Sequence, residues 1–100
     1  MQRQAIDGGA AWFDIDAADR IDEKTNWDGR NHISLATGSQ WEHEVLWRTK
    51  SKKWVLNSYS QRQGSIETWE QISDERAASW LIANEREHPD AAEEIAKLEI

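Results

Sequence analysis

The chain has 100 residues, of which 38% are hydrophobic and 31% are charged, and it carries a net charge of −7. This length allows one domain with a buried core, while the acidic balance disfavours direct binding to nucleic acid, which needs clustered lysine and arginine. The absence of cysteine excludes disulfides and thiolate catalysis, and no stretch has the apolar length of a signal peptide or a membrane span. We therefore expect a cytoplasmic protein that does not bind membranes.

The first third of the chain predicts a flexible N-terminus, one strand and one short helix. Residues 1–10 are polar and contain two adjacent glycines, as is typical of a frayed terminus. Residues 11–16 alternate between apolar and polar side chains and predict a strand. Asp16 has the chemistry of a helix N-cap, so we expect a short helix over residues 17–24.

The next segment predicts a turn and a short strand. Residues 27–31 contain an Asp-Gly pair, which supplies a local hydrogen bond and tolerates a positive φ, so they should form a turn. Residues 32–36 are then expected to form a short strand, which the Thr-Gly-Ser sequence at residues 37–39 should end.

The clearest local pattern is a β-hairpin over residues 41–59. Apolar and polar residues alternate in the first arm, and the second arm begins with Trp-Val-Leu after the polar stretch 50–53. A turn centred on Ser51 and Lys52 would place Trp47 opposite Leu56. These two residues would then form a cross-strand apolar pair on the core face.

The C-terminal third predicts a strand and two helices. Residues 66–72 alternate as a strand does, and Ser73 is a good N-cap for a helix with an apolar face that runs to about Glu87. The proline at position 89 should end that helix. Asp90 and Glu93 have the spacing of a capping box for a last short helix, and we expect this last segment to be dispensable for folding.

Together these elements predict an α+β domain, in which a C-terminal helix packs on one face of an antiparallel sheet of three to five strands. We expect a flexible N-terminus over residues 1–10, a single domain over residues 11–88 and a short acidic helix over residues 89–100. Seven tryptophans dominate the aromatic content. They are interpreted as core anchors, and the alternative is that one or two are exposed as contact anchors.

Two histidines and several carboxylates suggest a metal site or a catalytic pair. The candidate metal ligands are Asp28, His32, His43 and Glu44, provided that the histidines approach each other across neighbouring strands. The zinc-protease pattern is not met, because the fourth residue after His43 is a tryptophan. Glu42 and Glu44 share a strand face and are candidates for acid–base catalysis. Structural hydrogen bonding and ordinary solvation are the alternatives for these side chains.

A second polar stretch covers residues 57–63 and contains asparagine, serine and glutamine. With nearby tryptophans, such side chains could bind a sugar, and a loop that satisfies its own backbone groups is the alternative. The sequence contains no Ser-His-Asp triad, phosphate-binding glycine-rich loop or nucleotide fingerprint. We therefore expect no cofactor.

Charge is distributed unevenly along the chain. Residues 31–66 carry five basic and two acidic side chains, a net +3, whereas residues 67–100 carry three basic and ten acidic side chains, a net −7. The basic residues between positions 48 and 53 are interpreted as a solvated hairpin tip. The acidic third is either a face that keeps the protein soluble or a surface for a basic protein partner. The candidate binding residues are Glu67, Glu70, Asp74, Glu75, Asn31, Gln40 and Glu42.

Three segments carry a resemblance to other proteins. The stretches WDGRNHIS and ATGSQWEHE, followed by the hairpin and by ISDERAASWLIANE, resemble a small family of bacterial proteins without an assigned activity. The resemblance covers residues 12–88 and leaves residues 89–100 outside. It implies a single domain of bacterial, plasmid or phage origin, and it implies no reaction.

The sequence therefore predicts a small acidic protein that is not an enzyme and that binds a protein partner. We expect it to act by occluding a surface on a larger, basic protein. Immunity proteins, antitoxins and phage-encoded inhibitors have similar size and charge and act in this way, so this expectation rests on analogy with those classes of protein. The alternative is a domain that binds a metal or a small ligand, a hydrolase included, through the cluster around His32 and His43.

Overall fold

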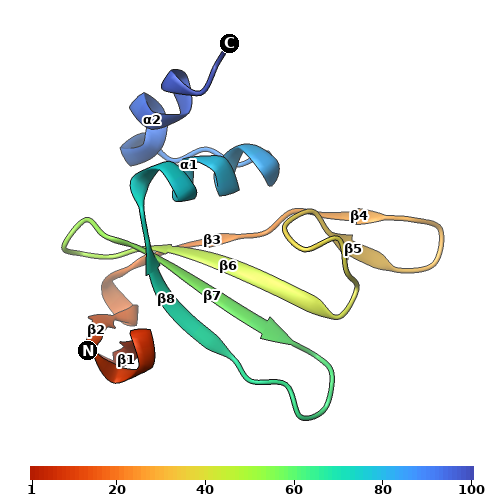
Figure 1. The fold of residues 1–100 in the computed structure, drawn as a ribbon, viewed down its shortest axis with the longest axis horizontal. Coiled ribbons are helices and arrows are strands. Elements are labelled where there is room, and N and C mark those ends of the chain that lie inside the picture. Colours follow the sequence, from red (N-terminus) through yellow and green to blue (C-terminus); the bar gives the residue numbers. More distant parts are fainter.

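The computed structural model describes residues 1–100 and shows an α+β fold in which helices lie along one side of an antiparallel sheet (Figure 1). This confirms the predicted fold class. The main sheet has four strands in the order β3-β6-β7-β8, namely Asp19–Asp22, Glu42–Arg48, Trp54–Ser60 and Thr68–Ile72. Two hairpins complete the strands: β1 (Arg3–Ile6) pairs with β2 (Ala11–Asp14), and β4 (Thr25–Trp27) pairs with β5 (His32–Ser34). None of the helices has the length and apolarity needed to cross a membrane.

The predicted hairpin is present, but its register differs by one residue from the expected one. Trp47 lies opposite Val55, so the predicted pair of Trp47 with Leu56 is wrong. The cause is a three-residue loop, closed by a hydrogen bond from the Thr49 amide to the Lys53 carbonyl at 2.9 Å. Lys52 adopts a left-handed conformation with φ of 67°, which is typical of such loops.

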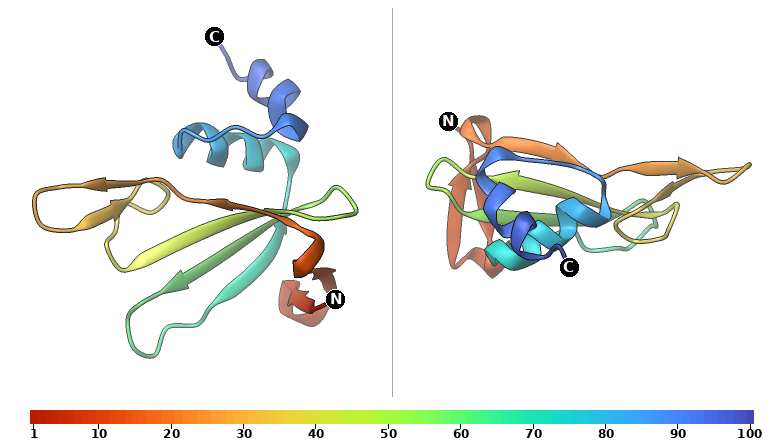
Figure 2. Two further views of the ribbon diagram at one scale, coloured as in Figure 1. Left: turned by 180° about the vertical axis from the view of Figure 1, so that it is seen from behind. Right: turned by 90° about the horizontal axis from the view of Figure 1, so that it is seen from above.

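Both faces of the main sheet are covered, which explains the continuous buried runs in β6 and β7. On one face Leu46 and Leu56 pack against Trp80 and Leu81 of helix α1 (Asp74–Ala83). The opposite face carries a second cluster, which consists of Val45, Trp47 and Val55 with Ile6 and Phe13 of the β1–β2 hairpin. Strands buried on both faces lose the simple alternation of apolar and polar residues. The N-terminal hairpin and the helices are seen from two further directions in Figure 2.

Two expectations for the N-terminal third are corrected. Residues 1–10 were expected to be flexible, but they contain all of β1 and the 3-10 turn Asp7–Gly9, and Ile6 packs in the cluster that covers the sheet. The helix expected over residues 17–24 does not form, and β3 occupies this stretch instead. Ile21 of β3 lies opposite Leu46 and packs on the helix-side core. A helix of this length is unstable without packing, so the pairing with β6 decides its structure.

Helix α1 begins as predicted and ends earlier. The Ser73 hydroxyl accepts a hydrogen bond from the Arg76 amide at 3.1 Å, which confirms the N-cap. The helix was expected to reach about Glu87, but it ends at Ala83. The side chain of Asn84 is fully buried and its amide donates to the Trp80 carbonyl at 2.9 Å, while the next residue has φ of 54°. A left-handed residue at this position ends a helix.

The last segment packs against the domain. It forms a 3-10 turn (Pro89–Ala91) and helix α2 (Ala92–Lys97), and Ala91 is 1% exposed within the helix-side core. The capping box expected from Asp90 is absent, because its carboxylate instead binds Arg48 at 3.1 Å. The segment is thus tied to β6 through charge and to the core through Ala91, and the expectation that it is dispensable is not supported by this packing.

Candidate binding site at Trp27 and Trp41

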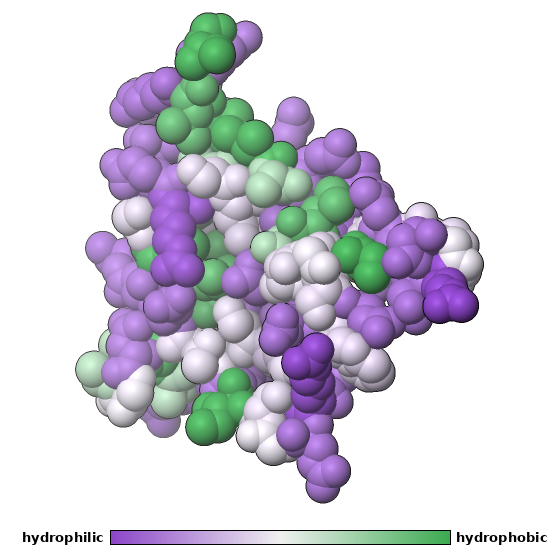
Figure 3. All heavy atoms as spheres, turned by 45° about the vertical axis from the view of Figure 1, so that its right-hand side comes forward, coloured by the Kyte–Doolittle hydropathy of each residue, from purple (hydrophilic) through white to green (hydrophobic).

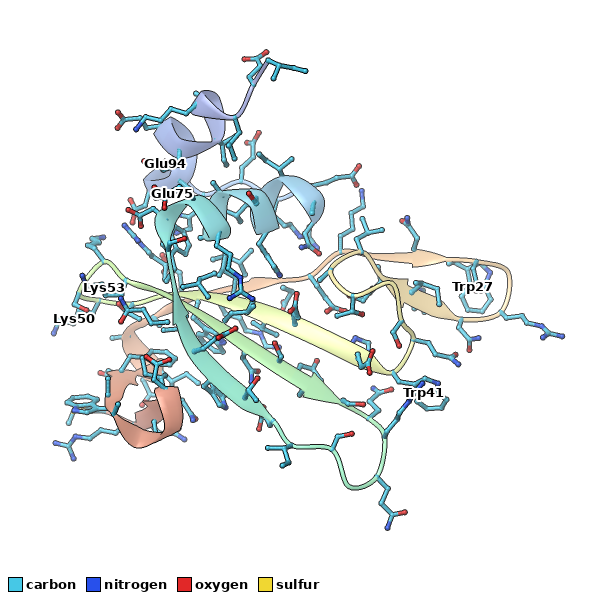
Figure 4. The ribbon with its side chains drawn as sticks, in the orientation of Figure 1. Trp27, Trp41, Lys50, Lys53, Glu75 and Glu94 are labelled. Carbon is cyan, nitrogen blue, oxygen red and sulfur yellow. The ribbon has the colours of Figure 1, made fainter.

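The tryptophans divide into buried and exposed sets. Trp47, Trp54 and Trp80 are 7%, 2% and 8% exposed and anchor the two core clusters. Trp12, Trp27 and Trp41, by contrast, are 52%, 61% and 42% exposed, and Trp12 lies apart from the other two on the N-terminal hairpin. Figure 4 shows Trp27 and Trp41 at the same end of the molecule, away from the basic hairpin tip. A large aromatic side chain left in water is a candidate contact residue, because tryptophan is enriched where binding energy is concentrated.

The β4–β5 hairpin positions Trp27. The Asp28 carboxylate accepts hydrogen bonds from the amides of Asn31 at 2.8 Å and Arg30 at 2.9 Å, which confirms the predicted turn. These two bonds lower the pKa of Asp28 below its ordinary value, and the bond from Asn31 has the larger effect. The hairpin register places Trp27 opposite His32, and their ring centroids are 5.1 Å apart.

The loop before β6 positions Trp41 by hydroxyl groups. The Ser39 hydroxyl accepts hydrogen bonds from the amides of Trp41 at 2.9 Å and Glu42 at 3.2 Å. The Thr37 hydroxyl donates to the Glu42 carbonyl at 2.7 Å. The Gln61 amide then donates to the Trp41 carbonyl at 2.9 Å, which joins this loop to the end of β7. The Thr-Gly-Ser break in the sequence therefore builds the support of an exposed indole.

These supports surround a hollow of about 310 Å³, which we call the tryptophan hollow. Its lining residues come from four separate segments and are Asn31, His32, Gln40, Trp41, His43 and Gln61. Trp27 does not line the hollow, but its ring contacts that of the lining residue His32 at a tilt of 58°. The side-chain amides of Asn31, Gln40 and Gln61 form no hydrogen bond within the chain, since only their backbone groups do. The hollow therefore presents several donors and acceptors without intramolecular partners.

His43 differs from the other lining residues because both of its ring nitrogens are engaged. Nδ1 lies 2.7 Å from the Glu23 carboxylate, and Nε2 lies 3.1 Å from the Gln40 carbonyl. The imidazole also contacts the Tyr59 ring, with centroids 5.4 Å apart. This imidazole is a structural member of the wall, which matches the alternative of structural hydrogen bonding. It has no free nitrogen for a metal or a substrate.

The structure brings the candidate metal ligands together only in pairs. His32 and His43 line the tryptophan hollow, whereas Asp28 caps the hairpin turn. Glu42, His43 and Glu44 line a second hollow of about 320 Å³ with several hydroxyl groups. The Glu44 carboxylate accepts the indole N–H of Trp80 at 3.1 Å. The chain contains no group of three or more histidine, aspartate or glutamate side chains placed to hold a metal ion.

The predicted binding residues fall into two separate regions. Asn31 and Gln40 line the tryptophan hollow, and Glu42 lies beside it. The four acidic residues are elsewhere: Glu70 is paired with Arg76 at 3.1 Å, Glu67 accepts a bond from Asn57 at 3.1 Å, and Asp74 and Glu75 form the first turn of α1. Figure 4 shows Glu75 on the helix side, far from Trp41.

A separate acidic face forms where the two helices meet. Lys97 of α2 has its pKa raised above the ordinary value, first by a hydrogen bond from its ammonium to Glu94 and then by the charges of Glu94, Glu93 and Glu75. Glu75 comes from α1 and the two other carboxylates come from α2, so the packing of the helices brings them together. Figure 4 shows the labelled Glu75 and Glu94 on the helix side of the molecule. We call Glu75, Glu93 and Glu94 the acidic helix face.

No protein-family model, no curated protein and no solved structure matches this chain. The kinship with a bacterial family, suggested by the two motifs around Trp27 and Trp41, therefore stays a prediction. Those motifs are nevertheless the segments that build the tryptophan hollow. Their value for interpretation lies in the geometry of the site.

Proposed function

We propose that the protein is a non-catalytic binding module and that the tryptophan hollow is its contact site. The observation that carries this proposal is the exposure of Trp27 and Trp41, at 61% and 42%, beside amide groups without partners in the chain. Covering an indole removes apolar surface from water, and a ligand that pairs with the amides replaces their hydrogen bonds to water. The first of these gains requires a partner molecule. The region is accordingly suited to recognition.

The chemistry of the hollow supports a role without catalysis. Its only titratable lining groups are His32 and His43, and the nitrogens of His43 are engaged by Glu23 and Gln40. His32 is therefore the one lining side chain with ring nitrogens left for proton transfer. The hydroxyl or thiol that would serve as a nucleophile is absent from the lining.

The test uses three single variants of exposed tryptophans. Trp27→Ala and Trp41→Ala remove the hollow's indoles, while Trp12→Ala removes one that is 52% exposed on the N-terminal hairpin, outside the hollow. Each variant and the native protein would be immobilised and exposed to a lysate of the native host. We expect the species retained by the native protein and by Trp12→Ala to be lost with the two hollow variants. Identical retention by all four proteins would contradict the proposal.

A second candidate function uses the acidic helix face to occlude a basic protein. It is favoured by the convergence of Glu75, Glu93 and Glu94 from two helices in a chain of net charge −7. In this proposal the module acts in the cytoplasm on a protein partner and binds no nucleic acid directly. Charges at a rim mainly speed encounter, and salt screens them over about 10 Å at 0.1 M.

The two candidates are distinguished by the salt dependence of association. Replacing the three glutamates of the acidic helix face by glutamine should slow association with a basic partner at low salt. The difference from the native protein should vanish at high salt. Unchanged rates at low salt, measured with a partner identified by the capture experiment, would exclude this face as the steering surface.

A further inference from the structure

We infer that the tryptophan hollow binds a neutral saccharide, and this inference rests on the proposed binding role of that site. The lining is uncharged apart from its two histidines, and Trp41 is its one hydrophobic residue. A ligand that fits must offer many hydrogen-bonding groups and no net charge. It must also present a flat apolar face to an indole. A sugar ring combines these properties.

The amide groups match hydroxyl chemistry. Asn31, Gln40 and Gln61 each carry an acceptor oxygen and an NH₂ group with two donors, and none of these is used within the chain. A sugar hydroxyl donates one hydrogen bond and accepts others, as a serine hydroxyl does. Adjacent hydroxyls on one ring can therefore pair with several amides at once. A purely apolar ligand would pair with none of these groups, and a purely anionic ligand would leave their acceptor oxygens unpaired.

The aromatic groups supply the second half of the match. Trp41 lines the hollow, and Trp27 adjoins it through its tilted ring contact with His32, with centroids 5.1 Å apart. Tryptophan offers a large apolar face together with one N–H donor. The C–H groups on one side of a pyranose ring form an apolar surface that such a face can cover. At about 310 Å³ the hollow is at the small end of ligand sites, which suits a single sugar ring.

Charge around the hollow disfavours a polyanion. The carboxylates of Asp28 and Glu42 stand beside the lining residues, and Arg30 and Arg62 balance them in number. Proteins that bind single strands combine stacking aromatics with a positively charged groove. A basic excess is missing from this end of a chain whose net charge is −7. Stacking of nucleobases is consequently the weaker interpretation of the same indoles.

A protein partner is also less well matched. Binding centres between proteins are fully desolvated and rich in apolar anchors that fill pockets. Figure 3 brings this side of the molecule forward and shows apolar residues scattered among polar ones, with the green group at the top lying towards the C-terminus. The exposed apolar residues Leu98 and Ile100 belong to the C-terminal segment and are distant in sequence from the hollow. The hollow itself lacks the apolar lining of a protein-binding centre.

The test is a nuclear magnetic resonance titration that observes the indole N–H signals of all seven tryptophans. The full-length protein labelled with ¹⁵N would receive neutral trisaccharides of glucose, mannose, galactose or N-acetylglucosamine, each up to about 10 mM, which detects dissociation constants near 1 mM. We expect at least one saccharide to shift the Trp41 and Trp27 signals in a saturable manner. The buried signals of Trp47, Trp54 and Trp80 should stay in place, which shows that the fold is unchanged.

Variants and other ligand classes make the result decisive. Trp41→Ala should weaken saccharide binding by at least about tenfold, as expected for an anchor worth about 1.4 kcal/mol, and Trp12→Ala should leave it unchanged. Absence of a shift with every saccharide would overturn the inference. So would shifts of the same indoles by an oligothymidylate or by an uncharged polar peptide alone. In either case the proposed binding role is tested separately, by whether Trp27→Ala and Trp41→Ala still retain the species captured by the native protein.

Discussion

Two tryptophans of nearly equal burial should respond in opposite ways to the same substitution. Trp47 and Trp80 are 7% and 8% exposed, so replacement of either by phenylalanine removes a similar amount of buried ring. Their indole nitrogens differ. Trp80 Nε1 donates to the Glu44 carboxylate at 3.1 Å, whereas Trp47 Nε1 is buried without a hydrogen-bond partner.

The magnitude follows from hydrogen-bond energetics. Trp80→Phe loses a hydrogen bond to a charged group, which contributes about 1.5–3 kcal/mol. Trp47→Phe removes an unpaired N–H, whose burial costs about 1–3 kcal/mol. The packing losses nearly cancel between the two variants, because both are ring-for-ring changes in a core. We expect Trp80→Phe to lower the free energy of unfolding by at least about 2 kcal/mol more than Trp47→Phe does.

Equilibrium denaturation in urea would measure both variants against the native protein, with equal m-values as the check that the denatured state is unchanged. Trp47→Ala serves as the control for burial, and it should cost about 3–5 kcal/mol through the cavity left beside Phe13 and Trp69, whose ring centroids lie 6.0 Å from that of Trp47. Equal losses for the two phenylalanine variants would refute the reasoning. A larger loss for Trp47→Phe would indicate that its N–H is paired after all.

Three further outcomes are expected. Removal of residues 89–100 should lower the melting temperature by more than about 10 °C, because Ala91 lies in the core and about 1 kcal/mol shifts the melting temperature of a domain of this size by roughly 4–8 °C. A smaller change, measured by calorimetry, would show that this segment is dispensable for folding. The pKa of Asp90 is lowered, first by its hydrogen bond from Arg48. The ionised carboxylate therefore stabilises the fold at neutral pH, and this contribution is lost as pH falls below about 4. Denaturation at several pH values should show that Asp90→Asn has a lower free energy of unfolding than the native protein at pH 7 and an equal one in acid. A difference that is constant with pH would contradict the ion pair. Asp28→Ala should speed hydrogen exchange at the amides of Arg30 and Asn31, which donate hydrogen bonds to the Asp28 carboxylate. Unchanged protection of these amides would show that the turn forms without the carboxylate.

The tryptophan hollow was only partly predictable. Asn31 and Gln40 were named from the sequence as candidate binding residues, and His32 and His43 were grouped with a metal in mind. The two histidines do line one hollow, but no third metal-ligating side chain joins them there. Gln61 joins them only because β7 returns beside β6 and brings its end to the loop at Trp41. A contact of this kind depends on strand pairing, which local patterns do not specify.

Local chemistry determined the features that close within a few residues. The Asp28 turn, the Ser73 N-cap and the β6–β7 hairpin each depend on side chains and backbone groups that are neighbours along the chain, and each was predicted correctly. The register of that hairpin was predicted incorrectly. It depends on the left-handed conformation of Lys52, and a lysine in the sequence does not indicate such a conformation.

Tertiary structure alone decided which tryptophans are buried and what residues 1–10 and 17–24 become, whereas the strand predicted over residues 11–16 is present as β2. The N-terminal hairpin forms β1 and β2 because Phe13 completes a core with Trp47, and β3 replaces a short helix because Ile21 pairs with Leu46. Trp27, in contrast, lies on a hairpin that projects beyond the sheet, where no second layer covers it. Identical side chains thus become core or surface according to what packs over them, and burial of apolar area against distant segments is a property of the folded chain rather than of any local stretch.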